Sequence, residues 1–220
     1  MKKSTFDFEP QLVDYEGAVV RINFDVERVS ETIPAMGEGE DIVRDVFKAN
    51  VIRIPQPLTV EAVREELLKE GFSEIKADAI ANKVVLTLVL DGKASGDALA
   101  LAKSTAIAEI TEYDDSDNVN GFLFNGQPLW LDSTLRSKLE RRFKVEVSAH
   151  EATSSIHFED GSVITINPET GLTMLDSLEY YAKECYEVTQ SHKAAVLALD
   201  SVEAVTSYNF KTGYPPKLEF

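Results

Sequence analysis

The sequence predicts an α+β fold built as two small α+β domains. Three observations support this: β-branched stretches precede helical patterns in the first half, glycine-marked hairpins occur in the second half, and a long helical pattern follows them. The 220 residues, 44% of them hydrophobic, can bury a core in each domain. We expect an N-terminal domain over residues 1–95, a connecting helix over 96–116 and a C-terminal domain over 117–220 with two short hairpins and a long closing helix.

The N-terminal domain is expected to begin with strands. The stretch GAVVRINFDVERVS (17–30) is rich in β-branched residues and alternates imperfectly, as a strand does. The polar stretch ETIPAMGEGED (31–41) contains Gly and Pro and is typical of an exposed loop. A second strand is predicted within VFKANVIRIPQP (46–57), where the Pro55-Gln56-Pro57 break ends it.

A helix is predicted after these strands. Thr59 is a suitable N-cap, and Gly71 is suited to end the helix. Between them Val60, Val63 and Leu67 fall on one helical face. This pattern indicates an amphipathic helix.

Two more helical segments complete the first half. Ser73 can cap a helix over EIKADAIANKV, whose continuation VVLTLVL (84–90) is β-branched enough that helix and strand both remain open there. The alanine-rich stretch 97–113 contains no helix breaker and predicts the connecting helix. The acidic stretch DDSDNVNG (114–121) is expected to form a polar loop.

Two glycine-containing turns predict the hairpins of the C-terminal domain. Asn125-Gly126 stands between FLF and QPLWL, and Asp160-Gly161 stands between SSIHFE and SVITI. A two-residue type I′ turn needs positive φ at both central positions, which Asn-Gly and Asp-Gly tolerate best. The sequence therefore predicts one hairpin at each site.

The segment between the hairpins predicts a helix. Asp132 or Ser133 can cap it, and Leu135, Leu139 and Phe143 lie on one stripe. Just before it stands Trp130, which can be the corner of a small domain or the floor of a binding site. We favour the corner, since a buried Trp contributes a few kcal/mol at ~25 cal/mol per Å² of buried apolar surface.

The longest predicted element follows Asn167-Pro168. Apolar and small residues recur at alternating spacings of three and four, which is a heptad-like seam on a helix of roughly thirty residues, about 45 Å long. The seam residues are Leu175, Leu178, Ala182, Cys185, Thr189, His192, Val196 and Leu199. Such a helix has to pack on the N-terminal half, on helix 97–113 or on a second copy of the chain.

The charge of the chain argues against nucleic acid as a partner. With 38 acidic and 22 basic residues the net charge is −16, whereas proteins bind phosphate backbones by neutralising them with Lys and Arg. An acidic DNA mimic that inhibits a nucleic-acid enzyme stays as an alternative. Such mimics concentrate acids in rows, however, and here acids and bases are interspersed.

Neither a leader peptide nor a membrane segment is indicated. The opening MKKSTFDFEP has no apolar core of a signal peptide. The longest apolar run, VVLTLVL, is too short to span a bilayer, so no membrane partner is expected. The only cysteine, Cys185, excludes an intrachain disulfide and a cysteine-built zinc site.

The sequence indicates no catalytic, cofactor or metal site. Cys185 and His192 share a helix face, but seven residues place them about 10 Å apart along the axis, too far for a nucleophile–base pair. His157 should point away from the face that Ile156 and Phe158 share. A remote alternative is a metal-assisted hydrolase. Its ligands would come from Asp114, Asp115, Asp117, His150 and His157, whereas a weak Ca²⁺ site would use only Asp114, Asp115 and Asp117.

One short segment opposes the global charge. Five bases accompany a single acid, Glu140, within nine residues, which is typical either of the wet face of a helix or of a docking patch for an acidic surface. The bases are Arg136, Lys138, Arg141, Arg142 and Lys144. Together with the seam they give the candidate interface: Arg136, Lys138, Arg141, Arg142, Leu175, Leu178, Cys185, His192 and Val196.

The C-terminal half resembles a module of unknown function found at the C-termini of phage tail-fibre and related proteins. The similar segments are FLFNGQPLWLDSTLRSKLERR, SSIHFEDGSVITI and MLDSLEYYAKECYEVTQSHKAAVLAL. The ending SYNFKTGYPPKLEF, with ETIPAMGEGED and VFKANVIRIPQPLTV, is similar to a narrower group of phage and prophage hypothetical proteins. No long fibrous region precedes the module in these 220 residues.

The resemblance implies a virion or virion-assembly protein of the tail or its fibres. It brings no known activity, so we expect a non-enzymatic structural or assembly protein that acts through protein–protein contacts. The expected partners are other virion or assembly proteins, or a second copy of the chain in a homo-oligomer. The expected location is the virion, or the host cytoplasm during assembly.

Overall fold

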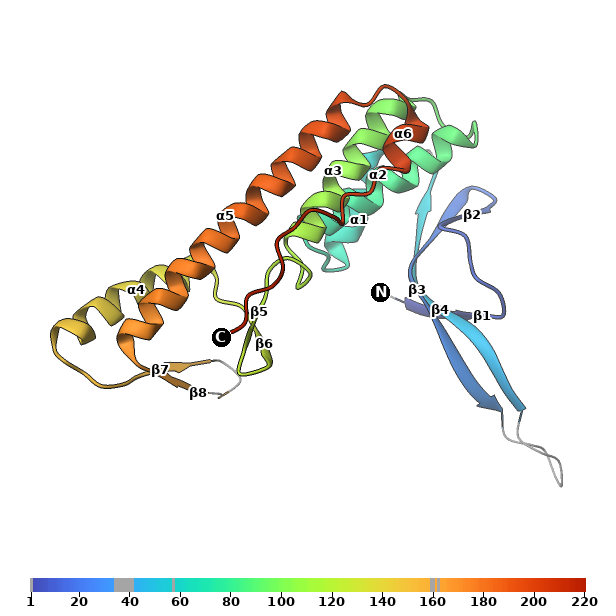
Figure 1. The fold of residues 1–220 in the computed structure, drawn as a ribbon. Helices are drawn as coiled ribbons and strands as arrows, with labels where there is room; N and C mark the ends of the chain where they lie inside the picture. Colours follow the sequence, from blue (N-terminus) through green and yellow to red (C-terminus); the bar gives the residue numbers. More distant parts are fainter. Residues whose placement is uncertain (1, 34–41, 57, 159–160, 162) are drawn as a thin grey trace. The chain divides into compact units, whose positions relative to one another are not determined.

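The computed structural model describes residues 2–33, 42–56, 58–158, 161 and 163–220, and it confirms the α+β fold class (Figure 1). Two compact units are formed. The first, unit 1, contains Met1–Glu109 and Val196–Tyr208, and the second, unit 2, contains Ile110–Ala195 and Asn209–Phe220. This division differs from the predicted one, because the chain returns to unit 1 after the long helix and then re-enters unit 2.

Unit 1 contains a four-stranded antiparallel sheet in the order β1-β4-β3-β2. Its strands are β1 (Lys2–Phe6), β2 (Val13–Glu16), β3 (Val19–Ile33) and β4 (Ile42–Pro55). The two predicted strands are therefore present and longer than expected, and residues 31–33 of the predicted loop belong to β3. The rest of that loop, residues 34–41, lies outside the described residues.

Helices α1 (Val60–Lys69) and α2 (Glu74–Leu90) cover one face of this sheet. The predicted caps are confirmed, because Thr59 accepts a hydrogen bond from the Ala62 amide and Ser73 accepts one from the Lys76 amide. The stretch VVLTLVL is helical. It continues the buried stripe of α2, since Ala77, Ala81, Val84 and Leu88 all lie in the core of unit 1.

Two further helices of unit 1 are the predicted connecting helix and the short helix that follows the long closing helix in the chain. The predicted connecting helix is α3 (Ala98–Asp114), and its residues up to Glu109 belong to unit 1. Lys103 on α3 donates a hydrogen bond of 2.7 Å to the carbonyl oxygen of Leu197. A short helix, α6 (Val202–Thr206), follows and is capped by Ser201.

Unit 2 begins with a short hairpin of β5 (Phe122–Phe124) and β6 (Gln127–Leu129). The type I′ prediction is confirmed, since Asn125 and Gly126 have φ values of 49° and 77°. Asp132, rather than Ser133, caps helix α4 (Ser133–Ser148) through the Leu135 amide.

The second predicted hairpin is also present, as β7 (Ser154–His157) and β8 (Val163–Ile166). Asp160 of its turn lies outside the described residues. As predicted, His157 is exposed, whereas Ile156 and Phe158 pack into the core of unit 2.

The long closing helix is α5 (Pro168–Ala198), of 31 residues. It packs closely on α4 near its start, because a Cβ atom added to Gly171 would lie 2.5 Å from Cε2 of Phe143. Leu175 and Leu178 complete this core with Phe122, Leu139 and Ile156. Glycine at position 171 thus allows the two helices to approach.

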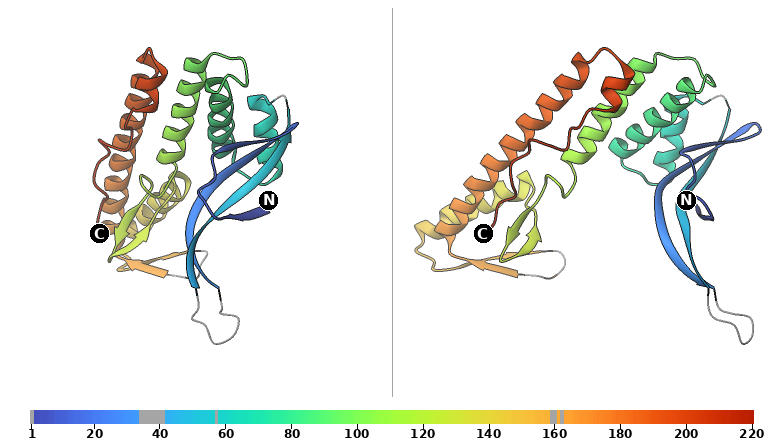
Figure 2. Two further views of the ribbon diagram at one scale, coloured as in Figure 1. Left: turned by 90° about the vertical axis from the view of Figure 1, so that its right-hand side faces the viewer. Right: turned by 45° about the vertical axis from the view of Figure 1, so that its right-hand side comes forward.

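The last residues of unit 2, 209–220, form an extended segment that we call the tail. Figures 1 and 2 show the tail in dark red running back beside α5 toward β5. There the amides of Leu123 and Asn125 donate to the carbonyl oxygens of Leu218 and Phe220, and the Phe220 amide donates to Leu123. The tail therefore pairs with β5 as a short third strand, in parallel at Glu219.

Candidate functional site

A surface groove runs between α5 and the tail in unit 2. It consists of two hollows of about 500 and 570 Å³ that share Glu184 and Pro215. The first hollow is lined by Asp176, Ser177, Tyr180, Tyr181, Glu184, Pro215, Pro216 and Leu218. The second is lined by Glu184, Glu187, Val188, Ser191, His192, Thr212, Gly213 and Pro215.

Hydrogen bonds from α5 hold the tail wall of the groove in place. Thr189 is fully buried, and its hydroxyl donates to the Asp114 carboxylate at 2.7 Å and lies 2.9 Å from the Tyr214 hydroxyl. His192 contacts the carbonyl oxygen of Thr212 through Nε2 at 2.9 Å. These contacts fix the backbone on the N-terminal side of Pro215.

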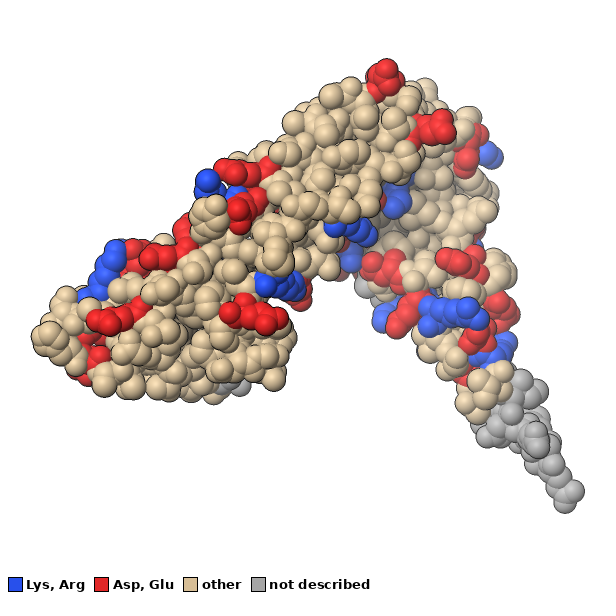
Figure 3. Space-filling view, viewed as in Figure 1, with Lys and Arg blue, Asp and Glu red and all other residues tan. Residues whose placement is uncertain are grey.

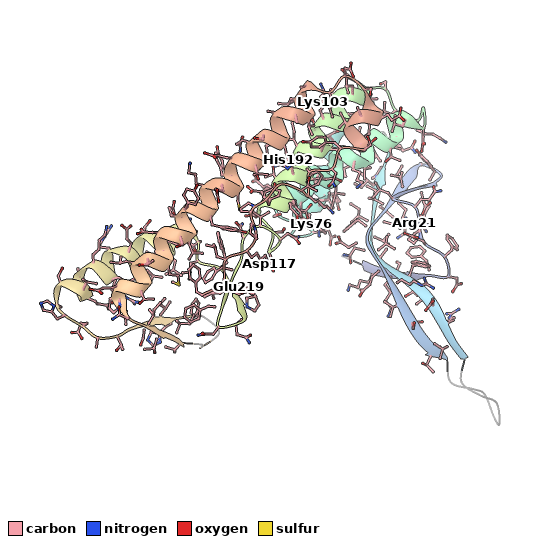
Figure 4. The ribbon with its side chains drawn as sticks, viewed as in Figure 1. Arg21, Lys76, Lys103, Asp117, His192 and Glu219 are labelled. Atoms are coloured by element: carbon pink, nitrogen blue, oxygen red, sulfur yellow. The ribbon has the colours of Figure 1, made fainter. Side chains whose placement is uncertain are left out.

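The other end of the tail is fixed on the acidic loop after α3. Lys217 donates a hydrogen bond of 2.6 Å to the carbonyl oxygen of Asp117, a residue labelled in Figure 4. Glu219 then follows along β5. Pro215 and Pro216 lie between the two attachment regions, and their fixed φ angles restrict the span that forms the wall.

The floor of the groove is apolar and firmly packed. Tyr181 is 2% exposed and donates through its hydroxyl to the carbonyl oxygen of Val119 at 2.8 Å. Cys185 packs beside it, and burial is the main cause that raises the pKa of its thiol. The thiol is therefore protonated at neutral pH and is a poor nucleophile.

The acidic side chains that line the groove outnumber the basic ones among its lining residues. Asp176, Glu184 and Glu187 line it. Lysines lie near these acids. Lys183 pairs with Glu187 at 3.3 Å, and Lys144 pairs with Glu140, which is the main cause that raises the pKa of Lys144, with a smaller contribution from Asp176. The groove thus keeps an acidic character.

The predicted seam interface is not available to another protein. Leu175, Leu178, Cys185 and Val196 are 4%, 0%, 3% and 0% exposed, because the chain's own core residues cover them. This corrects the interface predicted for these four residues. The heptad-like spacing is real, but it packs the helix within the chain.

The predicted basic patch is divided between buried and exposed side chains. Arg136 is 7% exposed, so it cannot belong to a docking patch, and Arg142 is half-buried near Glu146. Lys138 and Arg141 are exposed. Only part of the predicted patch therefore faces solvent.

His192 is the one seam residue of the predicted interface that lines the groove. Cys185 and His192 have separate surroundings, as their spacing predicts: the thiol packs with Tyr181, and the imidazole contacts the tail. Within the described ranges, no three His, Cys, Asp or Glu side chains group closely enough to hold a metal ion. Asp114, a predicted Ca²⁺ ligand, instead accepts the Thr189 hydrogen bond.

Trp130 is not among the residues that line the two hollows. It is partly buried against the core of unit 2 and against the cluster of Val119, Tyr181 and Cys185, and the Arg136 guanidinium lies 5.3 Å from its ring centroid. The groove is not among the sites that the sequence predicts. The signals that could have indicated it are the adjacent Tyr180-Tyr181 on a helix and the Pro215-Pro216 pair near the end of the chain.

Comparisons of the chain with protein-family models, with curated proteins and with solved structures give no match. None of the helices in the described part of the chain combines the length and the apolar character needed to cross a membrane.

Proposed function

We propose that this chain is a non-enzymatic phage or prophage structural or assembly protein, associated with the tail or its fibres, that acts by docking other virion proteins. The observation that carries the docking role is the groove between α5 and the tail, which exposes aromatic and proline surface on a fixed backbone. The resemblance of the C-terminal half to the tail-fibre-associated module supplies the biological context.

The groove has the composition of a protein-binding surface. Tyr180 stands 61% exposed on a long helix, and tyrosine provides large contact area at a small cost in conformational entropy. The opposite wall is Pro215-Pro216, whose backbone loses little freedom when a partner binds. A surface of this kind binds protein segments without any reactive group.

The charge distribution supports this proposal over an acidic mimic of DNA. On the face shown in Figure 3, acids on the sheet of unit 1 and along α5 alternate with Lys and Arg. In unit 1, Arg21 pairs with Asp14 and Glu16 at 2.6 and 2.9 Å, and Arg28 pairs with Asp45. A mimic needs carboxylates that stay free to contact a DNA-binding surface.

The experiment is a substitution in the phage or prophage that encodes the chain. Tyr180→Ala should lower the yield of infectious particles, because it removes exposed contact area from the groove. Tyr186→Ala is the matched control: Tyr186 is also 61% exposed on α5 but does not line the groove. Plaque counts and electron microscopy of purified particles measure the outcome. Normal particles and full infectivity after deletion of the whole gene would overturn the assembly role.

A further inference from the structure

We infer that the groove binds an extended, arginine-bearing segment of a protein partner. This inference rests on the proposed docking function and names the chemistry of the docked segment. It is drawn from the length of the groove, from the sign of the charges that line it and from its aromatic and proline surface.

The groove has the dimensions of an extended peptide. The lining residues of α5 run from Asp176 to His192, sixteen residues apart, which corresponds to about 24 Å of helix at 1.5 Å per residue. An extended chain advances about 3.3 Å per residue. A segment of roughly seven residues therefore spans both hollows.

The charges along the groove select a cationic segment. Asp176 lines the first hollow, Glu187 lines the second, and Glu184 lies where the two hollows meet. Among the described residues, Glu184 has no basic group within ion-pair distance, so its carboxylate is open to a basic side chain from outside. It is also half-buried, which strengthens a charge pair over one at the open surface.

The positive groups that face the groove do not cancel this selection. Lys183 is paired with Glu187, Lys144 is paired with Glu140, and Lys217 on the tail donates to the Asp117 carbonyl. His192 is held by the Thr212 carbonyl. Each of these groups already has an acceptor inside the chain.

The apolar surface favours arginine over lysine and favours proline or leucine between the basic residues. Tyr180 lines the same hollow as Glu184, and its ring already has the Lys183 ammonium 5.8 Å from its centroid. A planar guanidinium from the partner competes with this ammonium, because it can stack on the ring while it pairs with the Glu184 carboxylate. Pro215, Pro216 and Leu218 form an apolar wall opposite. Asp176 and Glu184 are about 12 Å apart along the helix, or three to four residues of an extended chain.

The test uses the full chain and a fluorescein-labelled heptapeptide, Arg-Pro-Leu-Arg-Pro-Leu-Arg, with binding followed by fluorescence anisotropy. Two control peptides replace either every arginine by glutamate or every proline and leucine by glycine and serine. We expect saturable binding of the first peptide, no binding of the glutamate peptide and weaker binding of the glycine–serine peptide. Binding should weaken with added salt.

Variants of the chain locate the binding. Glu184→Gln and Tyr180→Ala should each weaken the affinity for the arginine peptide by about tenfold, as loss of a central contact does. Tyr186→Ala and Glu151→Gln, which change an exposed tyrosine and an exposed acid outside the groove, should leave it unchanged. Far-ultraviolet circular dichroism confirms that each variant is folded.

Several outcomes overturn the inference. These are no saturable binding of the arginine peptide, equal binding of the glutamate peptide, or an equal loss in the Glu184→Gln and Glu151→Gln variants. If the peptide does not bind but Tyr180→Ala still lowers particle yield, the docking function stands, and the inference that the docked segment carries arginine fails. If the peptide binds but gene deletion leaves particles normal, the assembly role fails instead.

Discussion

The charge of Arg136 predicts a place on the surface, but the residue is buried and holds parts of unit 2 together. Its guanidinium donates hydrogen bonds of 2.7 Å to the carbonyl oxygen of Leu131 and of 2.9 Å to the Glu179 carboxylate. It also lies over the ring of Trp130. Leu131 is itself buried, so its carbonyl would lose its hydrogen bond without Arg136. The residue ties α4 to α5 and to the segment before α4.

Replacing Arg136 by Met should lower the free energy of unfolding by about 1–3 kcal/mol, because it leaves the Leu131 carbonyl buried and unsatisfied. Arg141→Met is the matched control: this arginine of the same helix is exposed, and its loss should change stability by less than about 0.5 kcal/mol. Urea unfolding followed by circular dichroism gives both values. Equal losses in the two variants would contradict the structural role.

The sequence contains a signal for the burial of Arg136 that its charge conceals. Arg136, Leu139 and Phe143 are spaced by three and four residues, so they share one helical face. Leu139 and Phe143 belong to the core of unit 2, and Arg136 follows them inward. Charge alone therefore overstates the basic cluster as a patch, because the helical phase of Arg136 places it on the core side of α4.

At the scale of elements, local signals predicted most of the helices and turns. The caps at Thr59, Ser73 and Asp132 and the Asn125-Gly126 turn depend on neighbours within four residues, so the sequence alone indicates them. Pairings between distant residues were not predicted. The pairing of Leu123 with Glu219 joins residues 96 apart in the chain, and it is one of the contacts that hold the tail wall of the groove.

The tail's pairing with β5 gives a prediction at this scale. Deleting residues 218–220 removes the three backbone hydrogen bonds to Leu123 and Asn125 and the edge-on contact of the Phe220 ring with Phe122, at 5.7 Å. Unit 2 should lose about 2–4 kcal/mol of stability, at roughly 1 kcal/mol per hydrogen bond plus the ring contact.

Amide hydrogen exchange distinguishes this pairing from a general loss of structure. In the shortened chain the amides of Leu123 and Asn125 should exchange much faster, since the tail supplies their acceptors. The amide of Val63 in α1, which donates to Thr59 in unit 1, serves as the internal control. Unchanged protection of Leu123 and Asn125 would show that the tail does not pair with β5.

At the scale of the whole molecule, the stability of the two units should depend on pH in different ways. The groups with shifted pKa values that matter here are carboxylates in unit 1 and a thiol and two phenols in unit 2. In unit 1, Arg53 lowers the pKa of Glu16, and Ser30 with Arg28 lowers the pKa of Asp45. A depressed folded-state pKa contributes stability above the unfolded value, and this stability is lost as the pH falls through the folded value. Unit 1 is thus expected to weaken in acid.

Unit 2 should respond in the opposite range. Burial is the main cause that raises the pKa of Cys185, Tyr181 and Tyr214, so the folded state holds all three groups protonated. Their contribution is complete below the unfolded-state values, which are 9.0 for the thiol and 10.0 for the phenols. It declines as the pH rises above those values, because only the unfolded chain ionises readily.

Fluorescence of Trp130, the only tryptophan of the chain, reports on unit 2 and measures this decline. The urea midpoint should be constant from pH 7 to about 8.5 and then fall, because the free energy of unfolding decreases by up to about 1.4 kcal/mol per pH unit for each group that ionises on unfolding. Tyr181→Phe should make the fall shallower above pH 10, because it removes a phenol that is 2% exposed in the folded chain. A midpoint that stays level to pH 11 would show that these three side chains are not buried in protonated form, and the packed floor of the groove would then be wrong.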